Sequence, residues 1–131
     1  MEGIQLTQTG QLLGTPAFMS PEQFMGSTLD SRTDIFSLGS IFYWLCTGEK
    51  PFPGETVTAI AYKVVQTAPV PARQLNPALA PDIDVILSRC LAKSPDKRYT
   101  TGHLLAADLD AFKAGRPVAA SGPTVASSSQ E

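Results

Sequence analysis

The stretch that decides the fold is SRTDIFSLGSIFYWLCT, residues 31–47. A helix built from it carries large apolar side chains on nearly every face: Ile35, Phe36, Leu38, Ile41, Phe42, Tyr43, Trp44, Leu45 and Cys46. A helix that is apolar all round is normally buried all round. Ser31, followed three residues later by Asp34, resembles a capping box, and Gly48 suits the left-handed position just past the helix end. We therefore expect a central buried helix against which the rest of the chain packs.

Three amphipathic helices are expected after this central one. The first spans about residues 55–66, the second starts at Pro81, and the third begins near Thr100 or Thr101. Each places its apolar residues at the i, i+3, i+4 spacing of a helix. Residues 72–80 are interpreted as a loop. No stretch has the alternating pattern of a strand, so the fold class is predicted to be all-α.

The two ends of the chain differ from the middle. Residues 1–15 are polar and without a clear period, and Pro21 then opens a single helical turn that Gly26 closes. Residues 116–131 consist mostly of Ala, Ser, Pro, Val and Gly, a composition typical of a disordered tail or linker. We expect one folded unit over residues 1–115 and a tail over residues 116–131.

Composition excludes several classes of function. The 131 residues carry a net charge of −2 with scattered basic residues, which does not favour nucleic-acid binding. No apolar run of about 18 residues predicts a membrane span, and the N-terminus lacks a secretory signal, so we expect a cytoplasmic protein. Cys46 and Cys90 are interpreted as core residues in a reducing compartment. With His103 as the single histidine they cannot build a zinc site, and nothing local supports a Cys–His nucleophilic pair.

Four blocks of sequence carry a family resemblance: GTPAFMSPE at 14–22, DIFSLG at 34–39, GEKPF at 48–52 and CLAKSPDKR at 90–98. In order and spacing they resemble the A-P-E end of the activation segment and the D-x-(W/F/Y)-S-x-G, G-x-x-P-F and C-L-x-K-x-P-x-x-R motifs of serine/threonine protein kinases. Each block alone is a weak signal, but together they are specific. Over about residues 5–114 the chain resembles a C-terminal lobe fragment of a bacterial-type (Hanks-type) kinase catalytic domain. The resemblance implies a partial all-α C-lobe, with the end of the activation segment and four main helices.

The resemblance also implies roles for charged residues. Glu22 and Arg98 are expected to form an ion pair that ties the activation segment to the loop before the last helix. Without the resemblance, the simpler interpretation is two unrelated surface charges. Asp34 has two interpretations: a helix-start acid that complements the helix dipole, or the family's acceptor for backbone groups of the catalytic loop.

The loop before the short helical turn carries the expected docking and regulatory residues. Gly14, Thr15 and Pro16 resemble the family's substrate-docking loop, and the threonine matches the position that is typical of serine/threonine kinases. The helix over residues 55–66 is expected to serve as a docking surface as well. Thr7 and Thr9 resemble phosphorylated threonines of bacterial-type activation loops, the alternative being plain polar loop residues.

The motifs that perform phosphoryl transfer are absent from these 131 residues. There is no G-x-G-x-x-G, V-A-I-K, H-R-D-L-x-x-x-N or D-F-G. The family uses ATP and Mg²⁺, but we expect no cofactor and no metal site in this chain, and no kinase activity from it alone. The expected partners are a protein substrate or a partner carrying the missing N-lobe, with self-association through an uncovered apolar helix face. The alternatives are a non-catalytic docking module and a degenerate remnant.

Overall fold

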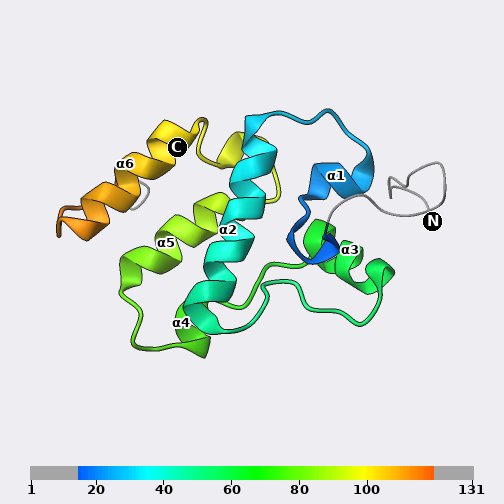
Figure 1. Cartoon of the computed structure of the whole chain (residues 1–131), viewed down its shortest axis with the longest axis horizontal. Coiled ribbons are helices and arrows are strands. Elements are labelled where there is room, and N and C mark those ends of the chain that lie inside the picture. Colours follow the sequence, from blue (N-terminus) through cyan, green and yellow to red (C-terminus); the bar gives the residue numbers. More distant parts are fainter. Residues whose placement is uncertain (1–14, 120–131) are drawn as a thin grey trace.

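The computed structural model describes residues 15–119 of the chain, and this part is helical with no strand (Figure 1). The all-α prediction is confirmed for it. The helical elements are η1 (Pro16–Phe18), α1 (Pro21–Met25), α2 (Ser31–Thr47), α3 (Val57–Gln66), α4 (Ala72–Leu75), α5 (Pro81–Cys90), η2 (Pro95–Lys97) and α6 (Gly102–Lys113).

Helix α2 is the central element, as its sequence predicts. It runs through the middle of the molecule, with α5 beside it and α6 on the far side of α5 (Figure 1). Gly39 makes the approach to α5 possible, because a Cβ at this position would lie 2.5 Å from Cβ of Cys90. Real Cβ atoms do not come so close, so the glycine determines how tightly these two helices pack.

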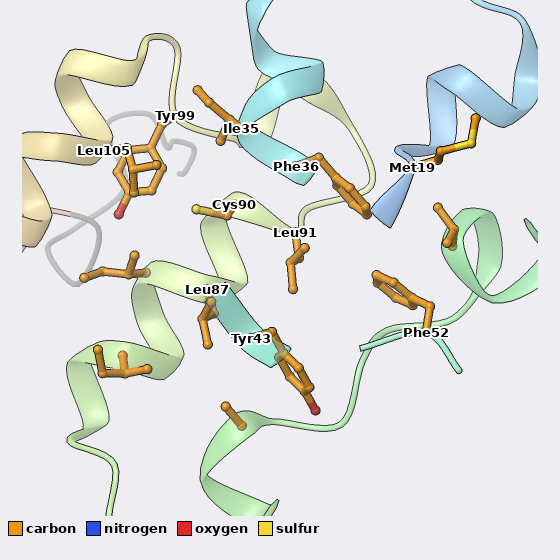
Figure 2. Packing of buried hydrophobic residues seen from close by; sticks show 14 of the residues in the cluster. Met19, Ile35, Phe36, Tyr43, Phe52, Leu87, Cys90, Leu91, Tyr99 and Leu105 are labelled. Atoms are coloured by element: carbon orange, nitrogen blue, oxygen red, sulfur yellow. The ribbon is translucent and has the colours of Figure 1, made fainter. Parts of the chain in front are cut away.

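The core lies between α2, α5 and the segments around them (Figure 2). Phe36 of α2 stacks on Phe52, with ring centroids 5.8 Å apart. Cys90 is buried, as expected, and burial raises the pKa of its thiol to about 12. Cys46 is only half-buried at the edge of the core.

The predicted capping box of α2 is wrong. Asp30 is the N-cap, and its carboxylate accepts the backbone N–H of Arg32 at 2.8 Å. Asp30 has the extended backbone that a cap needs, whereas Ser31 is already the first residue of the helix. The predicted end is confirmed, since Gly48 is left-handed with φ of 79°.

The other helix boundaries follow the sequence with two exceptions. Helix α3 begins at Val57 behind a Thr56 cap, two residues later than expected. Residues 72–75, interpreted as loop, form the short helix α4, which buries Ala72 against the core. One helical turn is too short to produce a periodic pattern. The predicted starts of α1, α5 and α6 are confirmed.

Helix α2 is not buried all round, contrary to its composition. One side carries fully buried residues such as Phe36, while the other exposes Leu38 at 53% and Leu45 at 75%, with Ile41 and Trp44 partly exposed. The described part of the chain therefore leaves one apolar side of α2 uncovered. We call this side the open face of α2.

Packing continues past residue 115, where the tail was expected to begin. Val118 is 2% exposed and the backbone N–H of Ala119 donates to Oδ1 of Asp108 at 2.7 Å. The remainder of the expected tail, residues 120–131, lies outside the described residues.

One buried polar atom of α2 lacks a partner within residues 15–119. The Oγ of Ser40 is buried and accepts or donates no hydrogen bond there. Ser40→Ala removes this unsatisfied group and adds a better helix former, so we expect the free energy of unfolding to rise by about 1 kcal/mol. Urea denaturation followed by circular dichroism measures it.

Ser20→Ala is the matched control for this change. Ser20 is equally buried, but its side chain caps α1 by accepting the backbone N–H of Gln23. We expect the free energy of unfolding of this variant to fall by about 1 kcal/mol. Destabilisation of similar size in both variants would contradict our account of Ser40.

Candidate functional site

A bidentate ion pair lies at the junction of α1, α2 and η2. Nη1 of Arg98 donates to Oε2 of Glu22 at 2.6 Å, and Nη2 donates to Oε1 at 2.9 Å. The Arg98 side chain is 0% exposed and that of Glu22 is 7% exposed. The structure thus brings the two charges together as the family resemblance implies, rather than leaving them as separate surface charges. The planar guanidinium suits this geometry because its fork matches the two carboxylate oxygens.

The remaining donors of Arg98 hold the backbone of neighbouring segments. Nε donates to the carbonyl oxygen of Ala92 at 2.8 Å, Nη1 to that of Arg32 at 3.0 Å and Nη2 to that of Lys93 at 3.0 Å. Its guanidinium also lies over the Phe36 ring, 4.9 Å from the centroid. One side chain therefore connects α1, the start of α2 and the link between α5 and η2.

The carboxylate of Glu22 is satisfied by more than Arg98. Oγ1 of Thr33 donates to Oε2 of Glu22 at 2.7 Å inside the same buried site. Burial alone would raise the pKa of the Glu22 carboxyl, but the hydrogen bonds from Arg98 and Thr33 hold it below the ordinary value of 4.5. The pair is therefore charged at neutral pH.

The segment before α1 packs against the core. Ala17 and Met19 are buried, while Thr15 is exposed and Pro16 is half-buried. Phe18 packs against Trp44 of α2 with ring centroids 5.5 Å apart, and Nζ of Lys50 lies 5.8 Å from the Trp44 ring. Residues 15–16 therefore lie at the surface, next to η1 side chains that pack against α2 and the core. Gly14, Thr7 and Thr9 lie outside the described residues.

Asp34 does not join the ion pair. It is exposed in the first turn of α2, where a negative charge complements the helix dipole. This position fits its local interpretation.

Sequence reasoning missed three contributors to this region. Thr33 has no sequence signal for its hydrogen bond to Glu22. Arg32 bridges Asp30 at 2.8 Å and Asp96 at 2.9 Å, which links the start of α2 to η2 at the surface. Lys93 lies within the C-L-x-K block, but its sequence position alone assigns it no contact.

An ATP·Mg²⁺ site requires metal ligands and donors to the phosphate groups. Within residues 15–119, no three His, Cys, Asp or Glu side chains are placed to hold a metal ion. The sequence also contains none of the glycine-rich, lysine, catalytic-loop or D-F-G motifs that hold the nucleotide and its metal. What the described residues show in this region is a fixed backbone around Arg98 and an exposed loop edge at Thr15.

The chain matches the family model described as "Protein kinase domain" over residues 3–109. The chain belongs to the protein kinase domain family. The buried ion pair, the central α2 and the loop edge at Thr15 and Pro16 are thus parts of a kinase C-lobe. No helix within residues 15–119 is long and apolar enough to cross a membrane.

Three bacterial relatives are similar over most of this chain. The serine/threonine-protein kinase PknB of Mycolicibacterium smegmatis is 42% identical over 107 residues, covering 82% of this chain and 17% of the relative. PknB of Mycobacterium leprae is 37% identical, covering 88% and 19%. The probable serine/threonine-protein kinase SCO3848 of Streptomyces coelicolor is 36% identical, covering 90% and 18%. The chain spans less than a fifth of the length of these relatives.

Breaking the ion pair tests its contribution to the fold. Glu22→Gln leaves the buried Arg98 without a counter-charge, so we expect a loss of about 3–5 kcal/mol of unfolding free energy. Thr33→Val is the control: it removes one hydrogen bond to the same carboxylate and should cost only about 1 kcal/mol. Urea denaturation at pH 7 measures both, and equal small losses would show that the pair is not structurally important.

The same pair gives a pH dependence with a definite sign. Because the pKa of Glu22 is lower in the folded protein than the ordinary 4.5, its stabilisation is present above pH 4.5 and is lost as the pH falls further. The difference in stability between the native chain and Glu22→Gln should therefore shrink on acidification. A difference that stays constant down to pH 3 would contradict this.

Proposed function

We propose that this chain forms the end of the activation segment and the substrate-docking side of a serine/threonine protein kinase domain. The kinase domain that contains it would catalyse ATP-dependent phosphorylation of Ser or Thr hydroxyls in proteins. The observation that carries the proposal is the buried bidentate contact of Arg98 with Glu22. The resemblance to the kinase motifs implies that this contact ties the activation segment to the loop before the last helix. The serine/threonine kinase relatives support the same class of substrate.

The geometry around the loop supports a docking role. Residues 15–16 are accessible, and η1 behind them packs on both α2 and α3. On α3, Tyr62 is 65% exposed and Val57 is 38% exposed. An exposed loop edge beside a helix with exposed apolar side chains can position an extended peptide.

We propose that the chain has no kinase activity alone. Stabilisation of the transferring phosphoryl group is the main catalytic contribution in this family, and it requires metal ligands and cationic donors around the nucleotide. These donors belong to motifs that the 131 residues do not contain. In this proposal, the contacts among Glu22, Arg98 and Thr33 hold the activation segment in place. Thr15 faces the bound substrate.

The open face of α2 favours a second function. A non-catalytic docking module would use this face to bind a partner, for example one that carries an N-lobe. The exposed Leu38 and Leu45 provide the apolar surface for such a contact.

A chimera tests the kinase assignment. Residues 3–109 replace the matching segment of PknB from Mycolicibacterium smegmatis, and the purified chimera is assayed with ATP·Mg²⁺ and casein. We expect phosphorylated casein from the chimera and none from the 131-residue chain. Mass spectrometry of the chimera should also find phosphate on Thr7 and Thr9, which we propose as acceptor sites.

Two controls make the result interpretable. The chimera carrying Glu22→Gln should lose most of its activity, because its activation segment is no longer held. Thr33→Val in the same chimera should retain most of it. A folded chimera without activity would refute the kinase assignment, and turnover by the isolated chain would refute its proposed inactivity.

The open face of α2 predicts self-association of the isolated chain. We expect its apparent mass in gel filtration to rise with protein concentration, because association removes apolar surface from water. Leu45→Lys should suppress this rise. Leu104→Lys places the same charge at another exposed leucine, 48% exposed on α6, and should not. A concentration-independent monomer would contradict the prediction.

A further inference from the structure

Lys93 extends from the link between α5 and η2 to the end of a different helix. Its Nζ donates to the carbonyl oxygen of Val64 at 2.6 Å and to that of Lys63 at 3.1 Å. The same ammonium group lies 4.2 Å from the centroid of the Phe52 ring. It therefore binds the last turn of α3 and is held over an aromatic face.

Helix α3 lacks the usual means of ending. The last carbonyl groups of a helix have no partner within it and are commonly satisfied by a left-handed glycine turn. Here the C-cap is Thr67 in extended conformation, and its N–H satisfies the carbonyl of Lys63. Lys93 supplies donors from outside the helix and places a positive charge at the negative end of the helix dipole.

The backbone of Lys93 is fixed by the ion-pair site. Its carbonyl oxygen accepts Nη2 of Arg98, which at the same time grips Glu22. A continuous chain of contacts thus runs from α1 through Arg98 and Lys93 to the end of α3. These contacts link α3 to the activation segment in addition to the direct packing of α3 against α1 and η1.

We propose that Lys93 is a positioning residue that holds the end of α3 in its docking position through the hydrogen bonds of its amine to the carbonyl oxygens of Lys63 and Val64. The proposal rests on the docking role proposed for α3. Charged side chains on the surrounding elements are Glu22 (α1), Arg32 (α2), Lys63 (α3), Asp84 and Arg89 (α5), Asp108 (α6), and Asp96, Lys97 and Arg98 around η2.

The contribution of Lys93 to folding stability depends on pH with an unusual sign. Burial, with a smaller contribution from the charge of Arg98, lowers the pKa of Lys93 from 10.5 to about 8. Between pH 8 and 10.5 the folded state therefore binds fewer protons at this site than the unfolded state. The contribution of Lys93 to stability rises with pH across this window, although helix-end cations are usually expected to stabilise only when charged.

Several partly or fully buried acidic groups have the opposite effect on stability over the same pH range. The pKa values of Tyr43, Cys46, Cys90 and Tyr99 are all raised by burial. Raised pKa values of acids make the folded state less stable as the pH increases. The test must therefore compare the native chain with a variant that differs only at Lys93.

The first experiment measures the amine in the 131-residue chain. An NMR titration of the Lys93 Nζ should give a midpoint near pH 8. A midpoint near 10.5 would indicate a solvated amine that is not held against the end of α3. Urea midpoints of the native chain, relative to Lys93→Met, should rise from pH 7.5 to 9.5. Lys97→Met is the control, because it removes the same charge from an exposed position of η2. The difference in urea midpoint between the native chain and Lys97→Met should not rise over this pH range.

The second experiment measures docking in the PknB chimera. Lys93→Met should raise KM for casein about fivefold, the loss expected for about one net hydrogen bond, while leaving kcat and KM for ATP unchanged. Lys93→Arg keeps the donors and should restore KM, and Lys97→Met should have no effect. Equal KM values for Lys93→Met and Lys97→Met would overturn the positioning role. An inactive parent chimera would refute the kinase assignment but leave the titration as an independent test of Lys93.

Discussion

The arrangement of this chain depends on the buried contact between Arg98 and Glu22. A guanidinium removed from water must find a partner for each donor, and here a carboxylate and three backbone carbonyls supply them. Because those partners come from α1, the start of α2 and the link after α5, satisfying one side chain fixes three segments. The loop edge at Thr15 and Pro16 precedes α1, and the packing of Phe18 on Trp44 holds the same segment against α2.

One side of helix α2 packs against the core, and the other side is exposed to solvent. Its buried side packs on α5 at the distance that Gly39 allows, and its open face exposes leucines to solvent. Both sides follow from one nearly continuous apolar sequence.

Much of the fold could be predicted from local sequence, and the exceptions have physical causes. Gly48 and Thr101 mark helix ends because their conformational or capping preferences are strong and local. Asp30 and Ser31 are both good caps, so their order could not be settled without the backbone conformation. At the site, the family motifs indicate Glu22 and Arg98, but the contacts of Thr33 and Lys93 depend on how distant elements pack.

The sequence separation of the ion pair has a consequence for synthesis of the protein. Glu22 and Arg98 are 76 residues apart. At the usual 5–20 residues per second, a ribosome needs about 4–15 seconds to make that interval. During this time α1 and the apolar α2 have left the ribosome before the arginine that fixes them exists. In this interval the apolar α2 lacks the contact that fixes its start, so the nascent chain exposes apolar surface that chaperones can bind.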